Sequence, residues 1–212
     1  MATPLQPLDR GPGPRTGAPL REGARIPPAP RARYPWYVRL ILWLQRRKYG
    51  SELEPARLWG RMPPTFLMLT LLYRTIDRNR SPIEPGLRSL IQVRVSQINW
   101  CAFCVDLNGA TALERDVPAE KLAALADFAG SPLYSDREKA ALAFAEAMTD
   151  PRIGVDETVF AALQTHFDEQ SILELTALVA FQNLSSKFNA ALAVPPGGLC
   201  ARPPEVADRP RA

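Results

Sequence analysis

Two cysteines separated by two residues, Cys101 and Cys104, are the side chains of this sequence best suited to covalent chemistry. Because positions i and i+3 share one face of a helix, a helix that begins near Cys101 brings both sulfurs to its first turn. The unpaired backbone N–H groups and the positive dipole end of such a helix stabilise a thiolate. The spacing therefore predicts thiol redox chemistry. Two unreactive thiols, shielded from water by Trp100 and Phe103, are the alternative interpretation.

The sequence predicts neither a bound metal nor another cofactor at this pair. A structural zinc site needs about four ligands, whereas the chain has one further cysteine, Cys200, and one histidine, His166, both distant in sequence. A thioredoxin-like motif would follow a strand in a βαβ unit, and no such pattern precedes Cys101. Cys200 lies in a segment rich in proline and glycine, so we expect it to take no part in the chemistry.

Composition and charge favour a single globular domain in a reducing compartment. The chain has 212 residues, of which 46% are hydrophobic, enough for one sizeable core. It has three cysteines and no continuous apolar stretch between Met1 and Leu20, which predicts a cytoplasmic location. The formal net charge is +4, and arginines gather before residue 34, separated by proline and glycine. Since no aromatic side chain lies among them for base stacking, we expect no nucleic-acid binding.

Three segments are predicted along the chain. Residues 1–33 contain too few apolar side chains to offset the entropy of ordering them, so we expect a disordered basic tail. Residues 34–196 form the expected domain, and residues 197–212 a flexible tail. The domain begins with an apolar stretch, residues 34–44, that is too short to cross a bilayer. We expect this stretch to form a helix that packs on the domain or on a neighbouring subunit, without membrane association.

The pattern after residue 55 predicts an all-α domain, because no alternating strand pattern persists for more than a few residues. Pro63 and Pro64 suit the first turn of a helix that contains residues 66–73. A long helix is predicted from Asp168 to Leu192. Its apolar surface is wide enough for a central or subunit-facing position.

Two capping-box patterns predict further helix starts. Ser81-Pro-Ile-Glu84 has the S-x-x-E form and is expected to begin a helix that runs through Val95. Ser135-Asp-Arg-Glu138 repeats the pattern before an alanine-rich helix from Lys139 to Met148. Asp150-Pro151 is expected to end that helix.

The segment around the cysteines resembles the signature of alkylhydroperoxidase D-like (AhpD-like) and carboxymuconolactone decarboxylase-like proteins; it reads Arg94-Val-Ser-Gln-Ile-Asn-Trp-Cys-Ala-Phe-Cys-Val-Asp-Leu107. A second segment, Phe181-Gln-Asn-Leu-Ser-Ser-Lys-Phe-Asn189, is similar to the long C-terminal helix of that family. The resemblance covers most of the expected domain. It implies an AhpD-like helical bundle with the CxxC pair at the N-terminus of a core helix, and a homo-oligomer, usually a trimer or a hexamer.

The resemblance also implies roles for the two cysteines. In redox-active members of the family the second cysteine attacks a peroxide and becomes a sulfenic acid, and the first resolves it as a disulfide, so these roles fall on Cys104 and Cys101. The chemistry suits a thiolate with a neighbouring thiol. An external thiol must then reduce the disulfide. We therefore expect a thiol-dependent peroxidase or thiol–disulfide oxidoreductase. The alternatives are a carboxymuconolactone decarboxylase-like enzyme and a helical oligomer with structural or redox-sensing cysteines.

The proton relay of the family is degenerate in this sequence. Family members use a glutamate about three helical turns before the first cysteine and a histidine four residues after the second, and here these positions are Ser89 and Asn108. Both side chains hydrogen-bond, but neither accepts a proton at neutral pH. Because a general base is worth about 10² to 10⁴ in rate, the resemblance implies a slow enzyme unless another group replaces the relay.

Three titratable residues are candidates to replace the relay: Asp106, Glu84 and His166. Asp106 is close in sequence, but its position two residues after Cys104 points it away from the sulfur. Glu84 is expected to cap a helix, and His166 to lie at the surface or at a helix end. The candidate pocket residues beside the cysteines are Trp100, Phe103 and Asp106.

Overall fold

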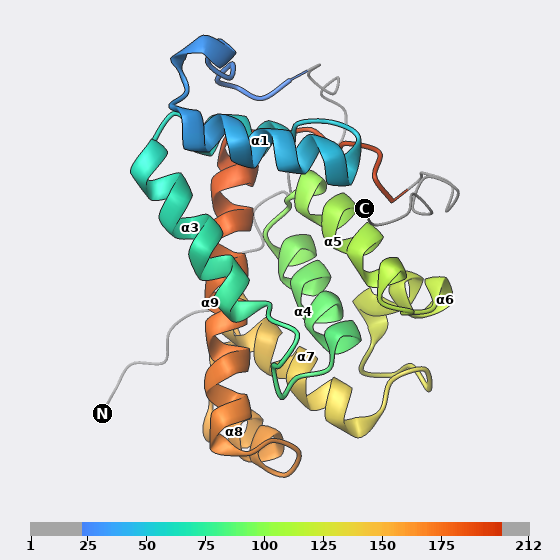
Figure 1. Ribbon diagram of the computed structural model, residues 1–212. Helices are drawn as coiled ribbons and strands as arrows, with labels where there is room; N and C mark the ends of the chain where they lie inside the picture. Colours follow the sequence, from blue (N-terminus) through green and yellow to red (C-terminus); the bar gives the residue numbers. More distant parts are fainter. Residues whose placement is uncertain (1–22, 201–212) are drawn as a thin grey trace.

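The computed structural model describes residues 23–200, and every regular element within them is helical, so the all-α prediction is confirmed. The α-helices are α1 (Trp36–Tyr49), α2 (Glu54–Trp59), α3 (Pro63–Ile76), α4 (Pro85–Ile98), α5 (Ala102–Glu114), α6 (Ala119–Ala123), α7 (Asp136–Thr149), α8 (Glu157–Gln164) and α9 (Glu169–Ala191) (Figure 1). Two short 3-10 helices, Arg31–Arg33 and Leu125–Asp127, complete the elements.

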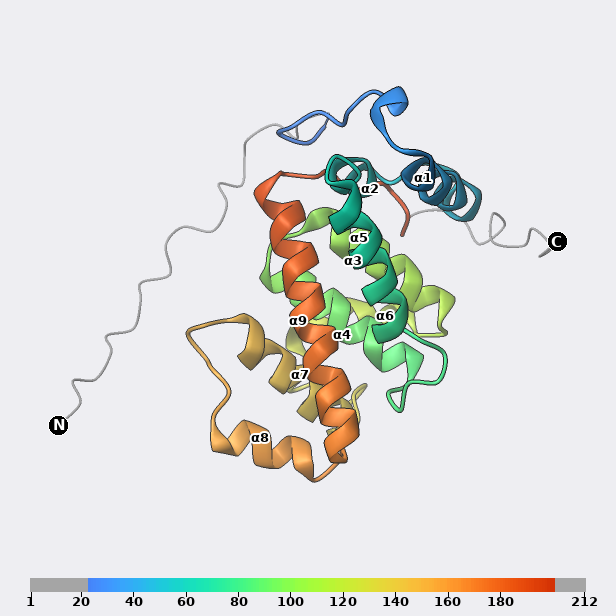
Figure 2. The same ribbon diagram turned by 60° about the vertical axis from the view of Figure 1, so that its left-hand side comes forward.

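Helix α4 forms the centre of the bundle and packs against α5, α7 and α9. The long helix α9 runs along the molecule, with α8 at one end and α1 crossing the other end (Figures 1 and 2). One apolar core surrounds α4 between α7 and α9, with Ile91, Leu142 and Val179 fully buried. A second core lies under α1 and contains both Cys101 and Cys104. The cysteine pair is therefore enclosed by the end of the bundle that α1 covers.

The two capping-box predictions have different outcomes. The Ser135 hydroxyl accepts a hydrogen bond from the Glu138 backbone N–H at 3.3 Å, and the Glu138 carboxylate accepts one from the Ser135 N–H at 2.9 Å, so this box is confirmed. The prediction at Ser81 is wrong, because α4 begins only at Pro85. Proline disfavours a helical conformation in the residue before it, and Glu84 is accordingly extended. Ser81 instead donates a hydrogen bond to Glu174 at 2.8 Å.

The chain ends differ from the three-segment prediction. Residues 1–22 and 201–212, most of the two predicted tails, lie outside the described residues. Residues 23–33, expected to be disordered, are held on the domain by their backbone: the Ala24 N–H donates to Glu54 at 2.9 Å and the Arg25 N–H to the Leu192 carbonyl at 2.7 Å. Backbone hydrogen bonds, which a count of apolar side chains does not measure, order this segment.

Helix α1 packs on the domain, as predicted for the stretch after residue 34, and also has an apolar outer surface. Val38 and Leu42 are buried against the domain, whereas Trp36, Trp43 and Leu44 are exposed. Within residues 23–200 no helix combines the length and apolar composition that crossing a bilayer requires.

Candidate functional site

The cysteine pair lies at the N-terminus of α5, as predicted. Cys101 is the N-cap residue, and its sulfur accepts a hydrogen bond from the Cys104 backbone N–H at 3.2 Å. The two sulfurs form a disulfide across a Cα–Cα distance of 5.2 Å. The turn from α4 into α5 is tight enough to place Trp100 at a φ of 56°, a left-handed conformation that is unfavourable for a bulky residue.

A cavity of about 410 Å³ between α1, α3, α5 and α9 has Cys104 in its wall. Phe103 lines the same cavity, whereas Cys101 lies behind it and is 1% exposed. Trp100 and Asp106, which the sequence suggested as pocket residues, do not line this cavity. Trp100 is 68% exposed because the left-handed turn directs its side chain outward.

Asn189, on the last turns of α9, makes the direct polar contact to the reactive pair. Its side-chain amide nitrogen lies 3.3 Å from the Cys104 sulfur and donates to it. The amide is 2% exposed, and its oxygen has no hydrogen-bond partner among the described residues. A hydrogen-bond donor fixed beside a buried sulfur favours the thiolate over the thiol.

A neutral hydrogen-bond network continues from the cysteines into the bundle. The Ser96 hydroxyl accepts from the Gln182 amide at 2.9 Å and from the Asn108 amide at 3.3 Å, and it donates to the Gln92 carbonyl at 2.6 Å. All four residues are buried. Asn108 thus occupies the predicted relay position and hydrogen-bonds there, but nothing in this network titrates near neutral pH.

Ser89, the other relay position, belongs to a different cluster. Its hydroxyl accepts a hydrogen bond from Arg115 at 3.1 Å. The same Arg115 pairs with Asp77 at 2.6 Å, and Arg88 pairs with the second oxygen of Asp77 at 2.9 Å. Burial alone would raise the pKa of Asp77, but the hydrogen bond and charge of Arg115, helped by Tyr73 and Arg88, hold it below its usual range.

Tyr73 connects that cluster to the cavity, which it lines from α3. Its hydroxyl donates to Asp77 at 3.0 Å. Burial, followed by the nearby Asp77 carboxylate, raises the pKa of Tyr73 far above its usual range. The phenol is therefore a fixed neutral donor and cannot serve as a base for Cys104.

Asp106 has a structural role that the sequence did not predict. Its carboxylate accepts hydrogen bonds at 2.9 Å from the backbone N–H groups of Gly197, Leu199 and Cys200. These contacts hold residues 197–200, part of the predicted flexible tail, against α5. Burial and the Asp106 charge raise the pKa of Cys200, which does not line the cavity.

His166 cannot act on the cysteines. It lies between α8 and α9, and Asn189 is near the far end of α9. At about 1.5 Å per residue, the helix separates them by roughly 30 Å, which agrees with the opposite positions of α8 and α5 in Figure 1.

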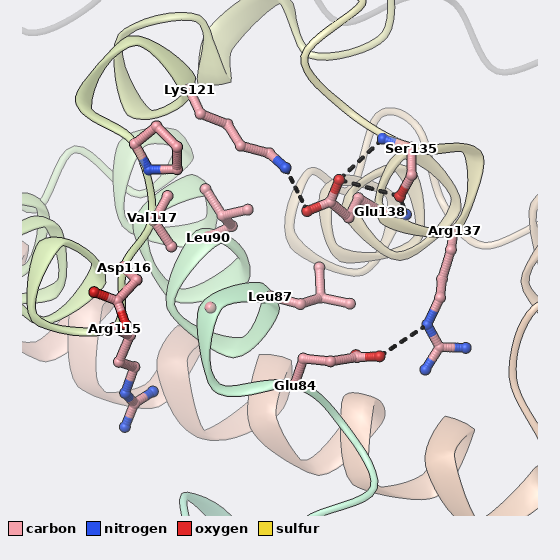
Figure 3. A pocket seen from close by; sticks show the side chains of 12 residues that line it. Glu84, Leu87, Leu90, Arg115, Asp116, Val117, Lys121, Ser135, Arg137 and Glu138 are labelled. Atoms are coloured by element: carbon pink, nitrogen blue, oxygen red, sulfur yellow. Dashed lines mark hydrogen bonds and ion pairs between the residues drawn. The ribbon is translucent and has the colours of Figure 1, made fainter.

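A second cavity of about 370 Å³ lies between α4, α6 and α7 and contains no thiol (Figure 3). Its charged side chains pair largely with one another: Glu84, the N-cap residue of α4, makes no side-chain capping hydrogen bond and lies 3.4 Å from Arg137, and Lys121 lies 2.6 Å from Glu138. Across residues 23–200, no group of three or more histidine, cysteine or acidic side chains is arranged to hold a metal. The first cavity is therefore the candidate site.

Sequence reasoning missed Asn189 and Gln182 as site residues, although a signal existed. In a helix, Gln182, Ser186 and Asn189 fall on one face, because their spacing of four and three residues matches the helical repeat. Buried polar side chains on one face of an otherwise apolar helix indicate a partner inside the fold.

Comparisons with known proteins identify a family and related folds. A sequence model of the carboxymuconolactone decarboxylase family matches residues 63–147. The uncharacterized protein YnjA of Escherichia coli (strain K12) is 42% identical over 174 residues, which cover 82% of this chain and 96% of that protein. An uncharacterized peroxidase-related protein from Silicibacter sp. TM1040 shares the fold with a TM-score of 0.77 and 19% identity, over 88% of this chain and 98% of its own. The debrominase Bmp8 superposes with a TM-score of 0.73 and 23% identity, over 83% and 94%.

Proposed function

The chain belongs to the carboxymuconolactone decarboxylase family, and we propose that it is a thiol-dependent peroxidase in which Cys104 attacks the peroxide and Cys101 resolves the product. The observation that carries the proposal is the position of the pair. Cys104 forms part of the cavity wall, and Cys101 lies within disulfide distance behind it.

The proposed cycle has three balanced steps. In the first step the Cys104 thiolate attacks the distal oxygen of a hydroperoxide, so that the S–O bond forms and the O–O bond breaks. The alkoxide leaves as an alcohol after taking a proton from the Cys101 thiol or from water. The Cys101 sulfur then attacks the sulfenic sulfur; the S–S bond forms, the S–O bond breaks, and the hydroxide leaves as water after taking a proton from the Cys101 thiol, or from solvent when that thiol has already protonated the alkoxide. Two external thiols reduce the disulfide and become a disulfide themselves.

Thiolate formation in this proposal depends on fixed dipoles instead of a base. Asn189 donates to the Cys104 sulfur, and the first turn of α5 directs N–H groups toward the pair. Because Ser89 and Asn108 do not titrate near neutral pH, we expect a rate below that of a base-assisted site, by up to about 10² to 10⁴.

The test is a single-turnover reaction of fully reduced protein with one equivalent of hydroperoxide, followed by mass spectrometry of the cysteines. The expected product is the Cys101–Cys104 disulfide. Cys104→Ser should abolish peroxide consumption, Cys101→Ser should accumulate a sulfenic acid on Cys104 that dimedone traps, and Cys200→Ser is the matched control that should react normally. Consumption that persists in Cys104→Ser would overturn the proposal. A lyase reaction that survives Cys104→Ser would favour the decarboxylase-like alternative.

A further inference from the structure

The cavity beside Cys104 has an apolar wall with cations in its lining. Its apolar and aromatic lining residues include Ile41, Leu53, Trp59, Phe66, Leu69 and Leu107. Two further lining residues, Lys48 at the end of α1 and Arg74 on α3, are cationic. Among the described residues, no aspartate or glutamate belongs to this lining.

Neither of these two cations has a carboxylate partner within residues 23–200. Arg94, for comparison, lies 2.5 Å from Glu146. The Lys48 ammonium lies 4.8 Å from the centroid of the Tyr49 ring, a contact that positions the charge without neutralising it. Both cations are exposed, so an anion could approach them without losing its hydration.

Deeper in the cavity, the lining favours an apolar group over a charged one. Trp59 lines it and is stacked on Phe188 with ring centroids 3.7 Å apart, which gives a rigid apolar wall. At the sulfur, Cys104 and Asn189 are almost fully buried. A charged group has no counter-ion at this depth, whereas an apolar body gains from leaving water.

We propose that the substrate of this cavity is an organic hydroperoxide with an apolar body and an anionic group such as a carboxylate. Its peroxide meets Cys104, and its anionic group remains in solvent near Lys48 and Arg74. The inference rests on the proposed function and leaves its chemistry unchanged, since the anionic group takes no part in bond making. The cavity of about 410 Å³ lies within the usual size range of small-molecule sites.

The experiment uses two matched pairs of compounds. The reactive pair is cumene hydroperoxide with a para-carboxylate and its methyl ester, compared by kcat/KM with dithiothreitol as the reductant. The unreactive pair is 4-isopropylbenzoate and its methyl ester, compared by how well each protects reduced Cys104 from iodoacetamide. Both are measured in the parent protein, in Lys48→Gln/Arg74→Gln, and in the control Arg46→Gln/Arg80→Gln, which removes two exposed cations outside the cavity lining.

We expect the carboxylates to be favoured over their esters, by about threefold for each cation. The preference should appear mainly in KM, weaken as ionic strength rises, vanish in Lys48→Gln/Arg74→Gln and persist in the control. The inference would be overturned if acid and ester had equal kcat/KM values and protected Cys104 equally. It would also be overturned if the preference for the acid survived in Lys48→Gln/Arg74→Gln. Protection by 4-isopropylbenzoate with no hydroperoxide turnover would support the anionic ligand and overturn the peroxidase proposal, so the two failures are distinguishable.

Discussion

Removing the Asn189 amide should raise the pKa of Cys104. A hydrogen bond to a charged group contributes about 1.5 to 3 kcal/mol, and one pKa unit corresponds to about 1.36 kcal/mol. Because the thiol form loses a weaker contact at the same time, we expect a net increase of about one unit in Asn189→Ala. Asn189→Asp keeps the shape but places a like charge beside the sulfur, so its effect on the pKa should be larger.

The effect on reaction rate is smaller than the effect on pKa. A rise of one unit reduces the thiolate fraction about tenfold below the pKa, but the more basic thiolate is the better nucleophile, with a Brønsted slope of about 0.4 to 0.5. The net decrease at fixed pH is therefore about three- to fourfold. The unsatisfied Asn189 oxygen is deleted together with the donor, so the free energy of unfolding should change by less than about 1 kcal/mol.

The assay is the pH dependence of iodoacetamide alkylation in a Cys101→Ser/Cys200→Ser background, where Cys104 is the remaining thiol. Serine is a favourable N-cap residue, so the start of α5 should be preserved. Asn183→Ala is the matched control, because Asn183 lies on the same helix and bonds to Thr149 instead of a sulfur. If both Asn189 variants titrate as the parent does while remaining folded, the amide does not stabilise the thiolate and this account of the site is wrong.

Four further outcomes can be measured on the purified protein. Asp106→Ala should release residues 197–200 and lower the free energy of unfolding by about 1 to 3 kcal/mol, as denaturant titration would show, whereas an unchanged midpoint would contradict this role. Asp77→Asn removes the carboxylate that pairs with the buried Arg88, and we expect a loss of about 3 to 5 kcal/mol in the same assay. The Tyr73 pKa is raised on folding, so its contribution to the free energy of unfolding is complete below about pH 10 and is lost as the pH rises above that value. Tyr73→Phe should therefore make the free energy of unfolding fall less steeply at alkaline pH. Light scattering should show an oligomer that Met68→Glu, on the exposed apolar surface of α3, dissociates; a monomeric parent protein would refute that expectation.

Local features of the site were predictable from the sequence, and long-range ones were not. Cys101 and Cys104 were expected on one helical face because positions i and i+3 share a face in any helix, and the family resemblance implied that they lie at the N-terminus of that helix. Asn108 was identified through the family resemblance, which assigns the relay position to the residue one helical turn after Cys104. Asn189 lies 85 residues away from Cys104, and its contact depends on how α9 packs against α5, which no local pattern determines.

Asp106 also makes long-range contacts that the local sequence does not determine. Its side chain was expected to point away from the Cys104 sulfur, and its hydrogen bonds go to a backbone segment more than 90 residues downstream, which the sequence did not predict. The same applies to residues 23–33, where hydrogen bonds to α2 and to the end of α9 order a segment whose composition indicates disorder. Burial can be estimated from composition and periodicity, whereas the partners of individual backbone groups depend on the tertiary fold.

The position of Asn189 and of the Asp106 contacts near the C-terminus also affects biosynthesis. A ribosome makes Cys104 85 residues before Asn189, and the groups that complete the surroundings of the cysteines emerge only with the last residues of the domain. Until then the nascent chain carries two adjacent thiols without the amide, the cavity wall from α9 or the segment that covers α5. The environment that adjusts their reactivity therefore forms only after α9 and residues 197–200 have been made, and a product truncated before α9 would retain the cysteines without that environment.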